Sequence, residues 1–521
     1  MSLLPPLTLL VPLLYLAVAA VALANPGRRP GALPRLAEAT AFGGLIVSGL
    51  ALIQYLVAGP QSLGFGPGAA LIAFRLDAVS VTMALLVSFV GWIVVRYART
   101  YLDGEAREGA FHGLMLAALA GVLLLVQAGS LAVLVLAFIG VGFALRSLLL
   151  FYPERAEAQR AAAKFSRVWL AGDVALIGAA VLLWQSFGTA EIGQLAAAAQ
   201  ANGLTATGHA AAALLVIAAA LKTASFPLHG WLTEVMEAPT PVSALLHAGI
   251  INSGGVLLIM TAGIVQASAG AMAGLVMLGG FTALFGATVM LTQSAVKTAL
   301  AWSTVAQMGF MLLQCGLGLW PLALLHIVAH SLYKAHAFLG SGSAVTAVAS
   351  VKRPGPVAVP GMAAVAKAFL LALVLYAVVA VGFTALMGPK SPQSLALGVI
   401  LIFGVAYLVA QGLADAAPRA LTLRTGVASI AAGIAYFGFQ QIAIMLWGTG
   451  LPQPPAAGPL EWALIVLALF SFGLVAVAQA LFPLWAHHPA TAGLRVHLAN
   501  GLYLNAVLDR LIGGFRTTTS A

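Results

Sequence analysis

Charged residues are scarce in this sequence. Only 7% of the 521 residues are Asp, Glu, Lys or Arg, against about 25% in a typical soluble domain. With 62% hydrophobic residues, a soluble protein of this length could not cover its surface. Disorder is excluded because it requires low hydrophobicity and high charge. The net charge of +10 does not indicate a nucleic-acid binder, because the basic residues are scattered among apolar runs. A polytopic membrane protein remains.

Cysteine is nearly absent as well. The single Cys315 lies in an apolar run, which excludes a disulfide framework and any cysteine-based metal cluster within this chain. The sequence also contains no phosphate loop, dinucleotide fingerprint, Ser-His-Asp set or haem motif. We therefore expect no catalytic residues and no bound cofactor here, and a transport function rather than an enzyme.

Long apolar runs recur from end to end, and each is long enough to cross a bilayer as a helix of about 20 residues. The runs are continuous and rich in Ala and Leu, unlike the alternating strands of a barrel. We predict an all-α protein with about fifteen (14–16) transmembrane helices, at 4–24, 37–58, 77–97, 109–128, 130–151, 168–187, 209–228, 239–265, 270–293, 298–316, 320–346, 361–387, 395–414, 424–447 and 459–485.

The basic residues predict the orientation, because cytoplasmic loops are enriched in Lys and Arg. If the loops alternate sides, one side receives only Arg75 and Lys390. The side with many basic residues is therefore predicted to face the cytoplasm. We expect the N-terminus outside and the C-terminus in the cytoplasm of a bacterial inner membrane. The other, basic side receives Arg28, Arg29, Arg35, Arg99, Arg107, Arg155, Arg160, Lys164, Arg167, Lys297, Lys352, Arg353, Arg419, Arg424, Arg495, Arg510 and Arg516.

Charges inside the spans are costly in a membrane and usually mark ion pathways. One group surrounds Lys222, just before Pro227, which predicts a broken helix lining a polar cavity. Asp173, Glu234 and Glu237 are the nearby carboxylates. A lysine in such a cavity can pass protons on, with carboxylates and histidines as neighbours. The alternative is a buried ion pair that only fixes helix packing.

A second group consists of His326, His330 and Lys334, spaced so that all three share one helix face. Three titratable groups in a row are typical of a proton wire. Two His four residues apart could also bind a metal, but no neighbouring carboxylate or Cys ligand supports that alternative.

Several separated motifs, spread over residues 75–345, resemble the antiporter-like subunits of respiratory complex I and the Mrp cation/proton antiporters. The motifs are Arg75-Leu76-Asp77, Gly172-Asp173, the run from Lys222 to His247, Leu300 to Thr304 with Gln307-Met308-Gly309, and His330 to Lys334 with Phe338-Leu339. The resemblance implies two inverted five-helix repeats, each with a broken helix and a central lysine. Lys222 would serve the first half-channel, and His247, His326, His330 and Lys334 the link to the second.

The domain prediction follows from this resemblance. We expect N-terminal helices at 1–108, a first repeat at 109–265, a second at 270–414, and C-terminal helices with an amphipathic tail at 415–521.

The candidate path also includes Lys297 and Lys367. Lys367 is the only nearby candidate for the second exit.

Three features depart from the family pattern, one of which is the absence of the Phe-Phe-Ser-Lys-Asp-Glu-type segment that the family has in helix twelve. The family usually pairs the lysine of the broken helix with a glutamate on the fifth helix, where this chain has Ile139. Asp173, Glu234 or Glu237 would then supply the counter-charge. The long lateral C-terminal helix of the largest complex I subunit is also missing.

The run from Met236 to Asn252 resembles the membrane subunits of inorganic carbon pumps, which form one branch of this family. The short length of the chain also fits that branch. That resemblance implies a DabA-like partner with a carbonic-anhydrase-like zinc site, and a membrane subunit that conducts H⁺ or Na⁺ while the partner traps CO₂ as bicarbonate. The zinc would belong to the partner. The alternatives are a proton-pumping subunit of a complex I-type or Mrp-type complex, and a membrane scaffold for a soluble enzyme.

Overall fold

The chain folds into a bundle of long helices in a computed structural model, which describes residues 6–65, 71–343, 360–413, 419–485 and 488–511. The first half contains η1 (Leu7–Leu9), α1 (Leu10–Ala24), α2 (Leu33–Ala58), α3 (Ala78–Tyr101), α4 (Glu108–Val126), α5 (Leu131–Leu149), α6 (Ala156–Phe187), α7 (Ile192–Asn202), α8 (Ala206–Lys222), α9 (Gly230–Glu234), η2 (Val235–Glu237), α10 (Thr240–Ala248), η3 (Ile250–Asn252), α11 (Ser253–Met260) and α12 (Ala262–Gln266).

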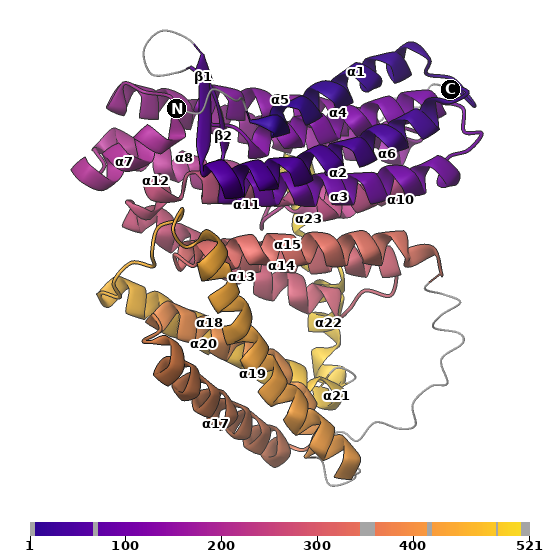
Figure 1. Cartoon of the computed structure of the whole chain (residues 1–521). Coiled ribbons are helices and arrows are strands. Elements are labelled where there is room, and N and C mark those ends of the chain that lie inside the picture. Colours follow the sequence, from indigo (N-terminus) through magenta and orange to yellow (C-terminus); the bar gives the residue numbers. More distant parts are fainter. Residues whose placement is uncertain (1–5, 66–70, 344–359, 414–418, 486–487, 512–521) are drawn as a thin grey trace.

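The second half is also helical. It contains α13 (Ala269–Met290), α14 (Val296–Gly316), α15 (Trp320–Leu339), η4 (Ser341–Ser343), α17 (Met362–Met387), α18 (Pro392–Gly412), α19 (Arg419–Trp447), α20 (Pro459–Ala480), α21 (Phe482–Trp485), η5 (Pro489–Thr491), α22 (Ala492–Ala499), η6 (Gly501–Tyr503) and α23 (Leu504–Leu511). Figure 1 shows α1–α12 as one block, α14 and α15 beside it, and α17–α20 on the far side.

Twelve helices in the described part are long and apolar enough to cross a membrane, so the chain is a multi-pass membrane protein. Each of the fifteen predicted runs contains a helix among the described residues, while 4–5, 344–346 and 414 lie outside them, and three of these helices fall outside the twelve. α8 and the apolar part of α18 are shorter than the twelve candidate spans. α14 is long enough but is not among the twelve. The predicted run 239–265 is divided into α10, α11 and α12, with η3 between the first two.

A small β-hairpin is the feature that the sequence patterns did not predict. β1 (Gln61–Phe65) pairs antiparallel with β2 (Ile72–Leu76), and Gln61 lies opposite Leu76. The amide of Arg75 donates to the Gln127 carbonyl, which holds the hairpin against the end of α4. Asp77 then caps α3 by accepting from the Ser80 amide. The hairpin lies outside the helical spans, so the all-α class stands.

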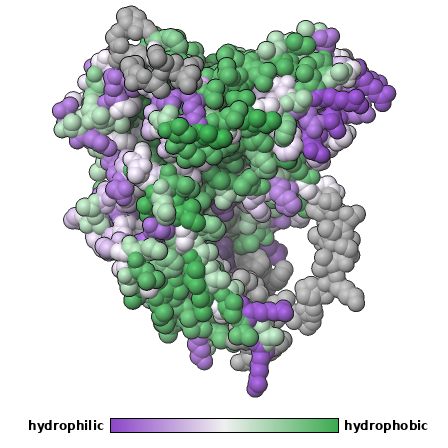
Figure 2. All heavy atoms as spheres, in the orientation of Figure 1, coloured by the Kyte–Doolittle hydropathy of each residue, from purple (hydrophilic) through white to green (hydrophobic). Residues whose placement is uncertain are grey.

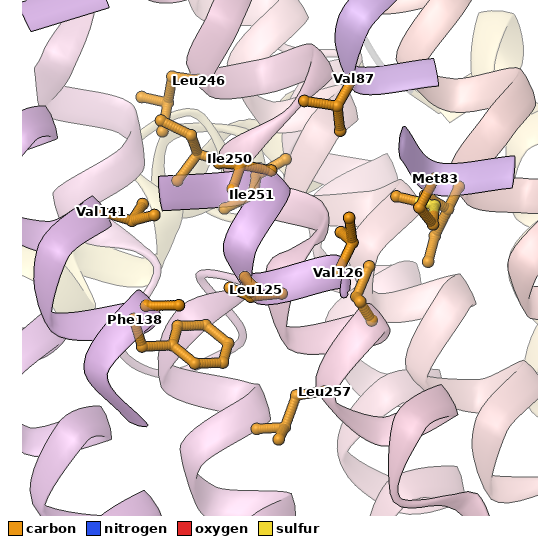
Figure 3. Packing of buried hydrophobic residues seen from close by; sticks show 14 of the residues in the cluster. Met83, Val87, Leu125, Val126, Phe138, Val141, Leu246, Ile250, Ile251 and Leu257 are labelled. Carbon is orange, nitrogen blue, oxygen red and sulfur yellow. The ribbon is translucent and has the colours of Figure 1, made fainter. Parts of the chain in front are cut away.

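Apolar packing holds the bundle together. Figure 3 shows Leu125 of α4, Phe138 of α5 and Ile251 of η3 meeting in the buried centre of the first half. α13 and α14 approach unusually closely because glycines face each other. A Cβ added at Gly279 would lie 2.4 Å from the Leu313 amide nitrogen, and small residues of this kind permit close helix contact in membranes.

The outer surface is apolar over the helices and polar near their ends (Figure 2). Large side chains such as Leu56, Phe143 and Val381 are exposed on α2, α5 and α17. A belt of this kind is what lipid requires, because the tails do not penalise exposed apolar surface. The polar groups buried inside the bundle therefore stand out, and they form the candidate site.

Candidate ion pathway

The broken helix places Lys222 in the interior. α8 ends at Lys222, residues 223–229 are not helical, and α9 begins at Gly230, with a cis peptide bond between Phe226 and Pro227. The break predicted near Pro227 is therefore present. Lys222 is fully buried, and Gly172 of α6 lets it approach, because a Cβ there would lie 3.0 Å from the Lys222 Cε.

Asp173 of α6 provides the counter-charge. Lys222 forms an ion pair with it and also donates a hydrogen bond of 3.1 Å to the Trp169 carbonyl. The Lys222 ammonium lies 3.9 Å from the centre of the Trp169 ring and 4.9 Å from that of Phe138, within cation–π range. Phe138, next to Ile139, thus contributes an aromatic face to Lys222.

The other two candidate carboxylates do not pair with Lys222 among the described contacts. Glu234, in α9, accepts from Lys164 at 2.8 Å and lies 3.5 Å from Arg160, both on α6. Glu237 ends η2, and its side chain lies outside the described residues. Of the three predicted carboxylates, Asp173 is thus the one that pairs with Lys222 among the described side chains, and Glu234 pairs with residues of α6 instead.

His247 links α10 to the second half. Its Nδ1 lies 3.0 Å from the hydroxyl of Thr304 in α14, and its ring stacks on Phe338 of α15 at 4.3 Å. Its Nε2 is buried without a hydrogen-bond partner among the described residues. Nearby, Asn252 donates to the Ser331 hydroxyl at 3.0 Å, so polar contacts cross this helix interface at two levels.

Lys334 is fully buried on α15, with His330 and His326 on the same face as predicted. Its ammonium donates to the Leu300 carbonyl at 3.0 Å and to the Ser303 hydroxyl. Within the described part of the chain, no carboxylate lies within ion-pair distance of it. Both partners of this lysine are neutral oxygens.

The two histidines lead from Lys334 to a cavity. The ring centres of His326 and His330 are 6.0 Å apart, and the Nδ1 of His326 lies 2.9 Å from the Gln314 carboxamide oxygen. Both ring nitrogens of His330 are buried without a partner among the described residues. The cavity, of about 390 Å³, is bordered by these two histidines together with Gln307, Gln314, Tyr333 and Tyr436. No three His, Cys, Asp or Glu side chains in the described part gather as metal ligands.

Two predicted path residues stand apart. Lys297 is half-buried at the second residue of α14, and Lys367 is exposed on α17. No described hydrogen bond or ion pair joins either residue to Lys222, His247 or Lys334. The aromatic rings around Lys222 were not among the predicted site residues. Neither were Ser303 and Thr304. The signal for these two hydroxyls was available, since they belong to one of the recognised motifs.

Comparisons with known proteins define the class. Residues 128–409 match the family model described as NADH:quinone oxidoreductase/Mrp antiporter, TM, and residues 66–112 match that of NADH-ubiquinone oxidoreductase (complex I), chain 5 N-terminus. The fold is similar to chains of the Mrp complex from Dietzia (TM-score 0.62, 20% identity, 98% of this chain and 61% of that one) and of the archaeal membrane-bound sulfane sulfur reductase (0.60, 15%, 96% and 99%). The chain belongs to the complex I/Mrp antiporter family of membrane subunits.

The curated relatives narrow this further. The chain is 36% identical to "Probable inorganic carbon transporter subunit DabB2" of Halothiobacillus neapolitanus, over 91% of this chain and 87% of the relative. It is 44% identical to the DabB of Hydrogenovibrio crunogenus, covering 53% of each, and 30% identical to NADH-quinone oxidoreductase subunit L of Mycobacterium tuberculosis, covering 89% and 72%. Within the family, the chain is a DabB-like inorganic carbon transporter subunit.

Proposed function

We propose that this subunit conducts a cation, H⁺ or Na⁺, across the membrane through the buried polar groups of α6, α8, α10, α14 and α15. The observation that carries the proposal is the pair of fully buried lysines, Lys222 and Lys334, in an otherwise apolar bundle. Ionisable groups at such depth are expensive and are usually retained for transport.

The middle of the proposed route is a group of polar side chains that lie close together. His247 reaches the Thr304 hydroxyl, and the adjacent Ser303 hydroxyl accepts from Lys334. From Lys334 the face of α15 continues through His330 and His326 to the cavity beside Gln314 and Tyr436. The first step, from the Lys222–Asp173 pair to His247, is part of the proposal, as is a role for Glu234, Glu237 or Lys297. Lys367, which is exposed on α17, is not assigned to the path in this proposal.

We propose further that the ion flux drives inorganic carbon uptake by a large DabA-like partner, which would hold zinc and hydrate CO₂ to bicarbonate. The DabB relatives support this proposal. The chain itself offers one buried cysteine, which cannot make a cysteine-based zinc site. The chemistry would thus reside in the partner, and the energy in the ion gradient.

The proposed orientation places the C-terminus in the cytoplasm and the N-terminus outside. Seventeen basic residues are predicted on one side by their loops, of which Lys352, Arg353 and Arg516 lie outside the described residues. The β1–β2 hairpin with Arg75 lies at the opposite helix ends (Figure 1). The division into two inverted repeats, at 109–265 and 270–414, stays a prediction.

Growth of a carbonic-anhydrase-deficient host in ambient air tests the proposal. The full chain and its co-purifying subunit should together restore growth, while Lys222→Met and Lys334→Met should abolish it. Lys390→Met is the matched control, since Lys390 lies between α17 and α18 and bonds only to Gln441 among the described residues. Normal rescue by the Lys222 and Lys334 variants would rule out a path through these lysines.

A second candidate function is a proton-pumping subunit of a complex I-type or Mrp-type assembly. The similarity to NADH-quinone oxidoreductase subunit L favours it. Purification from native membranes separates the two: redox or antiporter subunits would accompany the chain in the second case, and one large zinc protein in the first. The same variants test whether the chain is only a scaffold for a soluble enzyme. If it is, volume-matched substitution of both lysines will leave uptake intact.

A further inference from the structure

The C-terminal segment, residues 489–511, docks on its own chain and crosses from the second half to the first. The sequence predicts an amphipathic tail here, and Figure 1 shows α22 and α23 leading from α21 toward the first block. Gln293, after α13, donates to the Ala499 carbonyl at 3.2 Å, and a Cβ added at Gly501 would lie 3.2 Å from the Trp302 ring of α14. Leu504 then packs on the core of the first half.

At its end the segment completes a group of four charges, which we call the charged quartet: Arg160, Lys164, Glu234 and Asp509. Asp509 of α23 lies 2.7 Å from Arg160 and 2.7 Å from Lys164, and Lys164 lies 2.8 Å from Glu234. Lys164 and Asp509 are buried, at 6% and 10% side-chain exposure. The quartet is electrically neutral only when Asp509 is present.

Asn505 fixes the segment against the broken helix. Its carboxamide accepts from Lys164 and donates to Glu234, so it joins the two charges of the first half. It sits directly on Gly230, the first residue of α9, where an added Cβ would lie 1.9 Å from the Asn505 oxygen. The absence of a side chain at Gly230 is what permits this contact.

The charged quartet and the Lys222–Asp173 pair lie at two levels of the same helix, α6. Lys164 and Asp173 are nine residues apart on α6, about 13.5 Å along the helix axis. Between these levels the rings of Phe165, Trp169 and Trp231 pack on one another, with ring centres 5.1–6.4 Å apart. Gly230 is followed by Trp231, so a displacement of α9 would move both the quartet and the aromatic layer.

We propose that the C-terminal segment closes the access from the basic side to Lys222, and that release of Asn505 and Asp509 from Arg160, Lys164 and Glu234 admits the ion. This inference rests on the proposed ion conduction, which it deepens by assigning Asn505 and Asp509 as positioning residues. Ion pairs that must separate during each transport cycle form a natural two-state element.

A disulfide lock tests the requirement for opening. A Cβ at Gly230 lies 2.5 Å from the Asn505 Cγ, so the two Cβ atoms can approach to about 4.0 Å or less, which a disulfide accepts. In proteoliposomes of the full chain with its co-purifying subunit, the oxidised Gly230→Cys/Asn505→Cys variant should conduct at least tenfold more slowly, and dithiothreitol should restore it. Each single-cysteine variant is the control, and Cys315 is buried. Equal flux in the oxidised and reduced forms would overturn the proposal.

A second readout does not depend on flux. Ser225, buried in the broken part of the helix, is replaced by Cys and labelled with a membrane-impermeant thiol reagent from the basic side. Gly230→Ala and Asp509→Asn should each raise the labelling rate several-fold, while Gly493→Ala, with open space around it, should not. Unchanged labelling in both variants would overturn the closure. Absent flux in the wild-type chain with its co-purifying subunit would overturn the proposed function, and the labelling would still decide the closure.

Discussion

Two buried lysines in this protein are held in opposite ways. Lys222 in α8 is balanced by Asp173 and lies against two aromatic rings. Lys334 in α15 is held by a carbonyl and a hydroxyl, with no acidic partner in the described part. The first site is neutral when the lysine is protonated, whereas the second then carries an unbalanced charge.

This difference assigns the two sites different tasks. A balanced pair can keep its proton until an arriving cation disturbs it. An unbalanced charge in an apolar interior is expensive and repels a second positive charge nearby. The set from His247 to His330 lies next to the unbalanced lysine, and it can share the charge over several groups. We infer that the first site receives the ion and that the second passes it on.

The largest expected effect is on the paired site. Lys222→Gln leaves Asp173 buried without its partner, and we expect a loss of about 3–5 kcal/mol in the free energy of unfolding. Equilibrium unfolding in mixed detergent micelles measures it. The double variant Lys222→Gln/Asp173→Asn should recover most of the stability without recovering transport. If the single variant is as stable as the wild type, the pair is not the balanced unit described above.

The matching change at the second site should be mild. Lys334→Gln removes an unbalanced charge and keeps a hydrogen-bond donor, so we expect a change of no more than about 1 kcal/mol. Transport should nevertheless be lost. The same unfolding assay, paired with the growth assay, checks both statements. A loss as large as that of Lys222→Gln would reveal a counter-charge that the described contacts do not contain.

The link between the sites can be weakened separately. Thr304→Val removes the hydroxyl beside His247 and should cost about 1 kcal/mol of stability. Flux should fall several-fold, because the histidine loses its contact with the route to Lys334. Ser303→Ala acts on the Lys334 side of the same step. Thr261→Val, at a buried hydroxyl between α11 and α12 that donates to the Leu257 carbonyl, serves as the control with unchanged flux.

The smallest effect is expected at Lys367. Its side chain is exposed on α17, so Lys367→Gln should change stability by less than about 0.5 kcal/mol and leave flux unchanged. Flux assays of this variant beside Lys334→Gln decide whether the second exit uses it. A strong loss of flux would restore Lys367 to the path.

Local patterns predicted much of this molecule. The spacing of His326, His330 and Lys334 requires one helix face, and Pro227 requires a break, so both were readable from the sequence. The choice of Asp173 over Glu234 was not readable, because it depends on how α6 packs against α8 and α9. The docking of Asn505 on Gly230 was equally hidden, since a glycine at a helix start gives no hint of a distant partner.

The most direct test is the ion flux of the purified complex in proteoliposomes under an imposed gradient. Wild-type protein and Lys390→Met should conduct at the same rate, and Lys222→Met and Lys334→Met should each reduce the flux at least tenfold. That result would establish one route through two differently held lysines. Wild-type flux in either lysine variant would contradict it.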